Sequence, residues 1–297
     1  MNVFVTVIVV FLLSCCSNTF IVEGRSMAKA VPTVSDINQI DECLSSFVTK
    51  NDKLVLFLDY DGTLAPLASH PSLTVMEPES EAAIKSLAEL PNTYLAIISG
   101  RSADDAREKI KLEITYAGNH GLEIIFANKS RYQHEIDEES FKAFEKMAAE
   151  LETSLSSNGA WVENKKYSLT FHYRDVLEID QDNYKSRAMS IIEAYGFVPN
   201  PAHKAVEAKP PVLWNKGEAA LHILRQEFGD NWAERVKVIF AGDDTTDEDA
   251  MRSLKGLGIS FRVSAKPDIE TNADYRVPST KTVSLILQWL QSTMSQP

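Results

Sequence analysis

The sequence predicts an α/β protein with a doubly wound parallel sheet, interrupted by an inserted α+β module. Two observations predict the sheet: several apolar runs end abruptly in polar residues, and helical patterns separate these runs. Strands that alternate with helices at this spacing are typical of βαβ units. A third observation predicts the insertion, because between residues 124 and 208 the order changes to strand, helix, two strands, helix and strand.

The first apolar run, residues 54–58, leads directly into Asp59 and Asp61, with Gly62 after them. Such a run is typical of a buried strand in a parallel sheet, and ligands bind just beyond the carboxyl ends of such strands. Two carboxylates there repel each other unless a cation such as Mg2+ holds them. An aspartate can also attack phosphorus as a nucleophile. A solvated Asp-Gly-Thr turn is the alternative interpretation.

Further loops carry polar residues suited to one reaction. Ser99 follows the apolar run at residues 94–98, Lys216 opens a helical pattern, and Asp243 follows the run at residues 236–241. Phosphoryl transfer depends on positioning and charge neutralisation. A nucleophile, a neighbouring acid, a hydroxyl, a lysine and a carboxylate cluster in one chain therefore indicate that chemistry.

The remaining elements follow from hydrophobic spacing. It predicts helices over residues 36–50, 79–90, 138–156, 181–195 and 282–292, and strands at 53–58 and 115–117. Residues 167–174 alternate strictly between apolar and polar side chains, so we expect the aromatic face to pack on the inserted helices. The polar face could point to solvent or toward a ligand. Together with a second polar row at residues 203–209, it suits a hydroxyl-rich sugar better than an apolar ligand.

Composition excludes several classes of protein. The chain has 297 residues, 44% of them hydrophobic, and a net charge of −12, which is enough core for one or two domains. The acidic balance argues against a nucleic-acid partner, because phosphate backbones bind cationic surfaces. There is no Walker loop, dinucleotide-type glycine pattern or serine-elbow motif in the sequence, so kinases, dehydrogenases and serine hydrolases are poor candidates.

The N-terminus predicts a signal peptide over residues 1–24, because residues 3–16 are nearly all apolar but too few to span a bilayer. We therefore expect a secreted protein or one in the secretory pathway, with no stable membrane partner after cleavage. The positively charged segment that usually precedes the apolar core is missing. An uncleaved membrane anchor or a cytoplasmic location are the alternatives, and the oligomeric state is open.

The order of these loops resembles the haloacid-dehalogenase (HAD) superfamily of phosphatases. The longer strings LDYDGTLAP, SGR, GNHGLE and GDDTTDEDA resemble, more narrowly, the trehalose-6-phosphate phosphatase family. The resemblance extends from about residue 52 to the C-terminus. It implies a Rossmann-like HAD core, formed by residues 36–123 and 209–297, and an α+β cap at residues 124–208 that determines substrate specificity.

The resemblance also implies a mechanism that depends on Mg2+. Asp59 is then the nucleophile, which forms an aspartyl-phosphate, and Asp61 is the general acid and base. Ser99 and Lys216 hold the phosphoryl group. The metal takes the Asp59 carboxylate, the Asp61 backbone carbonyl and Asp243, and Asp244 and Asp247 are the next candidates.

The substrate implied is trehalose 6-phosphate, a small sugar phosphate. The residues expected to bind the sugar are Arg101, Asn119 and His120 in the core and Glu163, Lys165, Arg174 and Glu207 in the cap. Two alternatives stay open: a phosphatase of the same fold for another sugar phosphate such as sucrose phosphate, and a secreted, non-catalytic sugar-binding or storage protein. The leader keeps the second alternative open, because an exported enzyme would meet little sugar phosphate.

Overall fold

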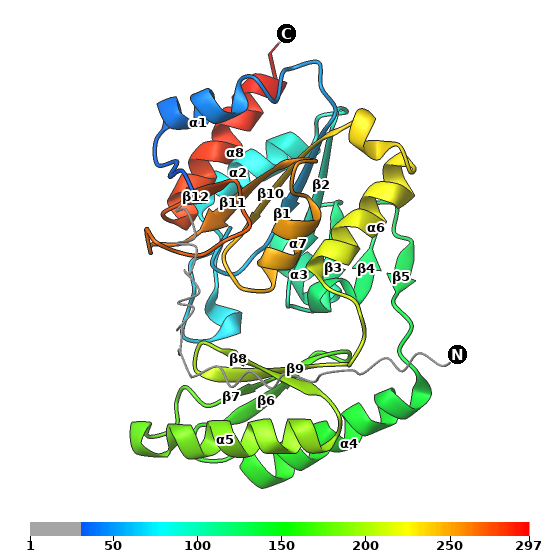
Figure 1. Cartoon of the computed structure of the whole chain (residues 1–297), viewed down its shortest axis with the longest axis vertical. Coiled ribbons are helices and arrows are strands. Elements are labelled where there is room, and N and C mark those ends of the chain that lie inside the picture. The colour runs from blue at the N-terminus through cyan, green and yellow to red at the C-terminus, as the bar shows by residue number, and fades with distance from the viewer. Residues whose placement is uncertain (1–30, 297) are drawn as a thin grey trace, which may run out of the picture.

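The computed structural model of the protein describes residues 31–296, so the expected signal peptide lies outside the described residues. One group of strands is β1 Leu54–Leu58, β2 Thr93–Ile98, β3 Thr115–Gly118, β4 Glu123–Ile125, β5 Arg131–Gln133, β10 Lys237–Gly242, β11 Ile259–Val263 and β12 Tyr275–Val277. They form one large sheet in the order β12-β11-β10-β1-β2-β3-β4-β5, in the upper part of Figure 1. A small sheet below it, in the order β6-β7-β9-β8, contains β6 Trp161–Asn164, β7 Leu169–His172, β8 Val198–Ala202 and β9 Ala205–Lys209.

The large sheet is parallel from β12 to β3, as the sequence predicted. Its last two strands differ from the expectation, since β4 and β5 form an antiparallel hairpin on the edge of this sheet. The short 3-10 turn η2 (Asn119–Gly121) reverses the chain after β3, so β4 runs back along its neighbour. The hairpin therefore belongs to the large sheet, although the insertion was expected to begin at residue 124.

Helices cover both faces of the large sheet, which makes it doubly wound (Figure 1). One face packs against α1 Ile37–Leu44, α2 Pro78–Ala88, α3 Ala103–Ile110 and α8 Thr280–Met294, and the other against α6 Lys216–Phe228 and α7 Asp247–Ser253. Alternate residues of β1 serve the two cores: Leu56 faces the first and Phe57 the second. Both side chains are fully buried, which is why this strand is apolar throughout.

The small sheet has its own core against α4 (Glu138–Leu155) and α5 (Glu178–Ala194), which lie on its lower face in Figure 1. Leu169 and Phe171 are fully buried in this core, so the predicted packing of the aromatic face is confirmed. The polar side chains of β7 face the large sheet instead of solvent, and Thr170 is buried there. Within residues 31–296 we find no helix with the length and apolar character that crossing a lipid bilayer requires.

Candidate active site

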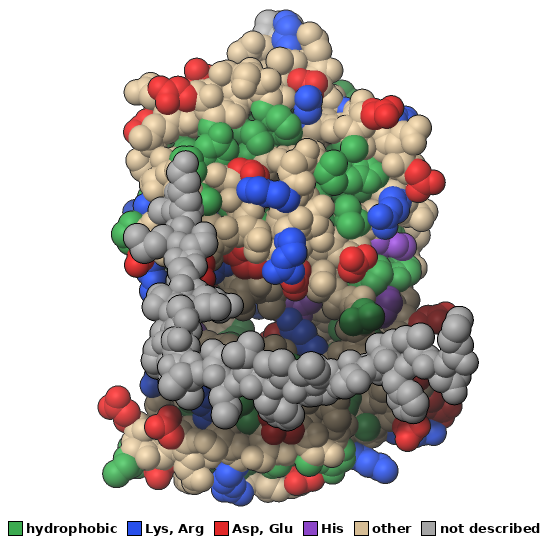
Figure 2. All heavy atoms as spheres, viewed as in Figure 1, with side chains coloured by type: hydrophobic (Ala, Val, Ile, Leu, Met, Phe, Trp, Pro, Cys, Tyr) green, Lys and Arg blue, Asp and Glu red, His purple; other side chains and the backbone are tan. Residues whose placement is uncertain are grey.

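The predicted site residues meet where the carboxyl ends of the large sheet face the small sheet. Figure 2 shows the molecule hollowed between these two parts, with Lys or Arg side chains at the opening. A cavity of about 290 Å³ lies there. From the large sheet it is lined by Asp59, Asp61, Ser99, Arg101, His120, Lys216 and Asp243, and from the small sheet by Glu163, Lys165, Thr170, His172, Arg174 and Glu207.

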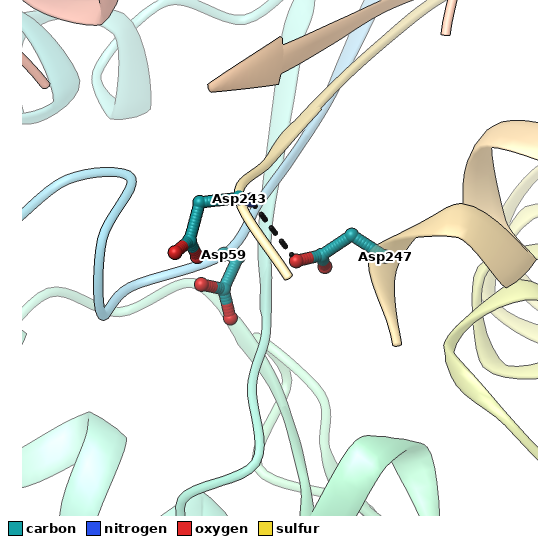
Figure 3. Close-up of side chains that lie close together, drawn as sticks. All are labelled: Asp59, Asp243 and Asp247. Carbon is teal, nitrogen blue, oxygen red and sulfur yellow. Dashed lines mark hydrogen bonds between the residues drawn. The ribbon is translucent and has the colours of Figure 1, made fainter. Parts of the chain in front are cut away.

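Three carboxylates gather at the bottom of the cavity. Oxygens of Asp59, Asp243 and Asp247 all lie within 4.8 Å of one another (Figure 3). Asp247 is fixed by accepting the backbone N–H groups of Asp243 at 3.1 Å and Asp244 at 2.9 Å. Burial raises the pKa of Asp59 and of Asp243, and the neighbouring carboxylates raise both further. The cluster is therefore destabilising on its own and suited to a cation.

Lys216 provides the positive charge next to this cluster. It is the first residue of α6, which Asn215 caps by accepting the backbone N–H of Gly217 and of Glu218. Its Nζ donates to Asp59 Oδ1 at 2.8 Å and to Asp247 Oδ1 at 2.7 Å. Burial alone would lower the pKa of Lys216, but the charges of these two carboxylates raise it. The side chain is thus a fixed ammonium ion.

Gly62 allows the loop after β1 to approach the cluster closely. Its φ of +78° favours glycine, and a Cβ added there would lie 2.1 Å from Asp243 Oδ2. Ser99 at the end of β2 is buried, and its Oγ accepts the backbone N–H of Arg101 at 3.2 Å. The loops after β1, β2 and β10 therefore close on one another around the carboxylates.

Asp61 lies apart from the three carboxylates and is held by Arg101. The guanidinium donates from Nε to Asp61 Oδ2 at 2.6 Å and from Nη2 to Asp61 Oδ1 at 2.8 Å. Its Nη1 donates to Asp105 Oδ2 at 2.6 Å. Burial would lower the pKa of Arg101, but the hydrogen bonds and charges of Asp61 and Asp105 raise it. Arg101, expected to bind sugar, is thus engaged by protein carboxylates.

A second charged cluster lies on the wall that the small sheet provides. Glu207 Oε1 is 2.7 Å from His120 Nε2. The same carboxylate forms ion pairs with Lys209 Nζ, 3.2 Å from Oε2, and with Lys165 Nζ, 3.8 Å from Oε1. Burial lowers the pKa of His120 to about 4, so at neutral pH it donates its Nε2–H to the Glu207 carboxylate. Burial works against ionisation of Glu207, but His120 and the lysines hold its pKa well below the usual range.

Asn119 is the one predicted sugar-binding residue that does not line the cavity. Its side chain is fully buried, and its Nδ2 donates to Glu123 Oε1 at 2.8 Å and to the Lys165 carbonyl at 3.0 Å. Its Oδ1 accepts the hydroxyl of Ser168 at 2.6 Å. Asn119 thus ties η2 to the small sheet.

Sequence reasoning did not name as site residues His172, which lines the cavity, or Lys209, which does not line it but pairs with Glu207. His172 Nε2 lies 2.9 Å from Glu163 Oε2, and Lys209 pairs with Glu207. Both belong to the alternating polar rows that the sequence shows, so the period of two was a signal for them. Arg174 donates to the Ala68 and His203 carbonyls, each at 3.2 Å.

Comparisons with known proteins agree with this geometry. A profile of the trehalose-phosphatase family matches residues 57–281. Probable trehalose-phosphate phosphatase 2 of Oryza sativa subsp. japonica is 34% identical over 270 residues, which cover 82% of this chain and 70% of that protein. Trehalose-phosphate phosphatase B of Arabidopsis thaliana is 31% identical over 279 residues, covering 88% and 73%.

Solved structures share the fold. The C-terminal domain of Candida albicans trehalose-6-phosphate phosphatase matches with a TM-score of 0.71 at 20% identity, over 88% of this chain and 98% of that chain. The family match, together with the carboxylate cluster and its lysine, defines a phosphatase of the HAD type. Within that class, the chain belongs to the trehalose-phosphatase family.

Proposed function

We propose that this phosphatase hydrolyses trehalose 6-phosphate to trehalose and inorganic phosphate. The observation that carries the proposal is the ion pair between Asp59 and Lys216. Both residues line a cavity whose opposite wall, formed by the small sheet, is polar. The names of the relatives support this substrate. A polar wall with two lysines around Glu207 offers donors and acceptors for sugar hydroxyls.

We propose Mg2+ as the cofactor, because the donor set fits a hard cation. Asp59, Asp243 and Asp247 each offer a carboxylate oxygen, and Mg2+ prefers oxygen ligands. Burial and the neighbouring carboxylates raise the pKa values of Asp59 and Asp243, and a bound cation would offset that repulsion. When bound, the ion would neutralise the phosphoryl oxygens. Of the two further candidates, Asp247 is the preferred ligand, because it points into the cluster (Figure 3).

The reaction proceeds in two displacements at phosphorus. A carboxylate oxygen of Asp59 forms a bond to phosphorus as the bond to the sugar oxygen breaks, and Asp61 gives that oxygen its proton. Water then attacks the aspartyl-phosphate, Asp61 takes the proton back, and phosphate leaves. Lys216 keeps Asp59 oriented throughout, and Ser99 at the end of β2 would contact the phosphoryl group.

The experiment that tests the proposal is phosphate release from trehalose 6-phosphate, sucrose 6-phosphate, glucose 6-phosphate and mannose 6-phosphate, each with Mg2+ and with EDTA. We expect a preference for the first of at least about tenfold in kcat/KM, which is about 1.4 kcal/mol, and no release in EDTA. A preference for sucrose 6-phosphate would replace the substrate and keep the class. No release from any of them would favour a sugar-binding protein.

We also propose that residues 1–24 direct the chain into the secretory pathway, which the apolar run at residues 3–16 supports. Expression of the full chain with a C-terminal tag in eukaryotic cells tests this. We expect tagged protein in the medium with a mass that lacks the leader. Tagged protein of full mass in the cytosol would contradict it.

A further inference from the structure

The loop at residues 66–75, called the flap below, lies between Arg101 and the small sheet. It follows β1 and contains the 3-10 turn η1 (Pro71–Leu73). Arg101 Nη2 donates to the Pro71 carbonyl and to Thr74 Oγ1, both at 2.8 Å. Lys109 of α3 donates to the Ser72 and Thr74 carbonyls at 3.3 Å. The flap is therefore anchored to the large-sheet side of the cavity through Arg101.

The other side of the flap contacts the small sheet. His70 stacks on Trp161 of β6 with ring centroids 4.8 Å apart and planes at 18°. Trp161 stacks in turn on His172 of β7, at 4.1 Å and 13°. Arg174 adds a hydrogen bond to the Ala68 carbonyl at 3.2 Å. The contacts of His70 with Trp161 and of Arg174 with Ala68 join the flap to the small sheet, so they exist only when the small sheet lies over the site.

His70 connects the two sides rigidly. Its Nδ1 accepts the backbone N–H of Ser72 at 3.1 Å and lies 2.7 Å from the Ser72 hydroxyl, so the imidazole caps η1. The carbonyl that Arg101 binds belongs to Pro71, the next residue. A shift of the ring is therefore transmitted to an acceptor of Arg101.

Arg101 is engaged mainly by acceptors within the protein. All three of its guanidinium nitrogens donate to protein acceptors, and the side chain is 6% exposed. Two of those bonds hold both oxygens of Asp61 in a bidentate pair, which fixes the plane of the carboxylate. The orientation of Asp61 therefore depends on the position of Arg101.

We propose that Arg101 is a positioning residue for Asp61, and that the flap makes this positioning depend on the contact between His70 and Trp161. Because both oxygens of Asp61 accept from Arg101, the contact holds the carboxylate form, which takes the proton from water in the second step. This general base is then in place only when the small sheet covers the site. This inference rests on the proposed function, and it assigns Arg101 a role other than sugar binding. Ring stacking contributes about 0.5–1.5 kcal/mol, so loss of the contact should lower kcat by about two- to tenfold.

The test is a double-mutant cycle with His70→Ala and Trp161→Ala in the full chain. Each variant should lower kcat for trehalose 6-phosphate by about two- to tenfold, and the double variant should fall no further. Trp161→Phe should retain most of the activity, because it keeps a ring on His70. Leu73→Ala, on an exposed side chain of the same turn, is the matched control and should match the wild type. Losses that multiply in the double variant would overturn the coupling.

Two further readouts separate positioning from sugar binding. Hydrolysis of p-nitrophenyl phosphate needs no sugar contact but passes through the same aspartyl-phosphate and needs the same base, so it should also fall in His70→Ala and Trp161→Ala. In Arg101→Lys, kcat for the sugar phosphate should fall by more than about tenfold, while inhibition by free trehalose should not change. Weaker inhibition by trehalose, or unchanged hydrolysis of p-nitrophenyl phosphate, would overturn the assignment.

Failure of the proposed function remains distinguishable from failure of this inference. If the wild type releases no phosphate from trehalose 6-phosphate, the proposed substrate is wrong. The same cycle is then measured on the sugar phosphate that the panel identifies, with that free sugar as inhibitor. Non-additive losses there would support the coupling, and additive losses would refute it.

Discussion

Replacing Asp59 by Asn should abolish turnover and, without metal, make the protein more stable. The substitution keeps the shape of the side chain and an oxygen that can accept from Lys216, but removes one charge. Asp59 lies within 4.8 Å of Asp243 and of Asp247. With an effective dielectric constant near 20, each of these pairs repels by about 3.5 kcal/mol or more when both carboxylates are ionised, which for Asp243 requires a pH above about 9.

The attraction to Lys216 offsets most of that repulsion. At the 2.8 Å separation it contributes about 6 kcal/mol on the same scale, so the carboxylate of Asp59 remains unfavourable by about 1 kcal/mol before its desolvation is included. We therefore expect Asp59→Asn to raise the free energy of unfolding in EDTA by about 1 kcal/mol or more. For a domain of this size the melting temperature should rise by about 2 °C or more.

Mg2+ should reverse the order of stability, so that the wild type becomes more stable than Asp59→Asn. At 100 times its Kd, a cation that binds only the folded state stabilises it by about 2.7 kcal/mol, and the variant has lost one of the carboxylates that hold it. The assay is thermal unfolding of both proteins in EDTA and in Mg2+, with phosphate release in parallel. Asp268→Asn, the same change on an exposed carboxylate, is the control and should leave the melting temperature and the rate of phosphate release unchanged. A variant that is less stable than the wild type in EDTA, or that still turns over, would refute the reasoning.

Three other outcomes are expected. The pKa of about 4 for His120 lies below the unfolded value, so His120 binds more protons in the unfolded state between pH 6.5 and 4. Its own contribution to stability should fall by about 3 kcal/mol across that range, and urea unfolding should show that stability falls less steeply, or rises more, with decreasing pH in His120→Asn than in the wild type. Gly62→Ala should raise the Mg2+ concentration needed for half-maximal activity by tenfold or more in a metal titration, because its Cβ would displace Asp243; an unchanged titration would contradict the close approach. Glu163→Gln should raise KM for the sugar phosphate more than it lowers kcat, and an unchanged KM would remove Glu163 from the sugar site.

The chemical loops could be predicted because parallel strands end at one edge of a sheet. Asp59 and Asp243 are far apart in the sequence, but β1 and β10 are neighbours in register. Lys216 joins them because α6 begins at the same edge. In each case the side chain belongs to a short motif at the end of a strand or at the start of a helix. Its position can therefore be predicted without knowing which distant residues it contacts.

The partners of individual side chains could not be predicted in this way. Arg101 and Asn119 are of types that bind sugars, but here their hydrogen-bonding groups are engaged by Asp61, 40 residues away, and by Ser168, 49 residues away. Those pairings depend on how the flap and the small sheet close over the large sheet. The hairpin β4–β5 escaped prediction for a related reason, since short strands show which residues are extended but not which sheet they join.

The charges of the site explain why a metal and a cap are both needed. Three carboxylates and Lys216 give the cluster a net charge of about −2 when all four are ionised, and a phosphate monoester is also an anion. A divalent cation would neutralise the cluster but leave no surplus to attract the substrate. Further positive charge lies on the opposite wall, at Lys165 and Arg174, which line the cavity. The small sheet must therefore lie over the site to bring this charge near the phosphoryl group, which is why its contact with the flap is a suitable place to control Asp61.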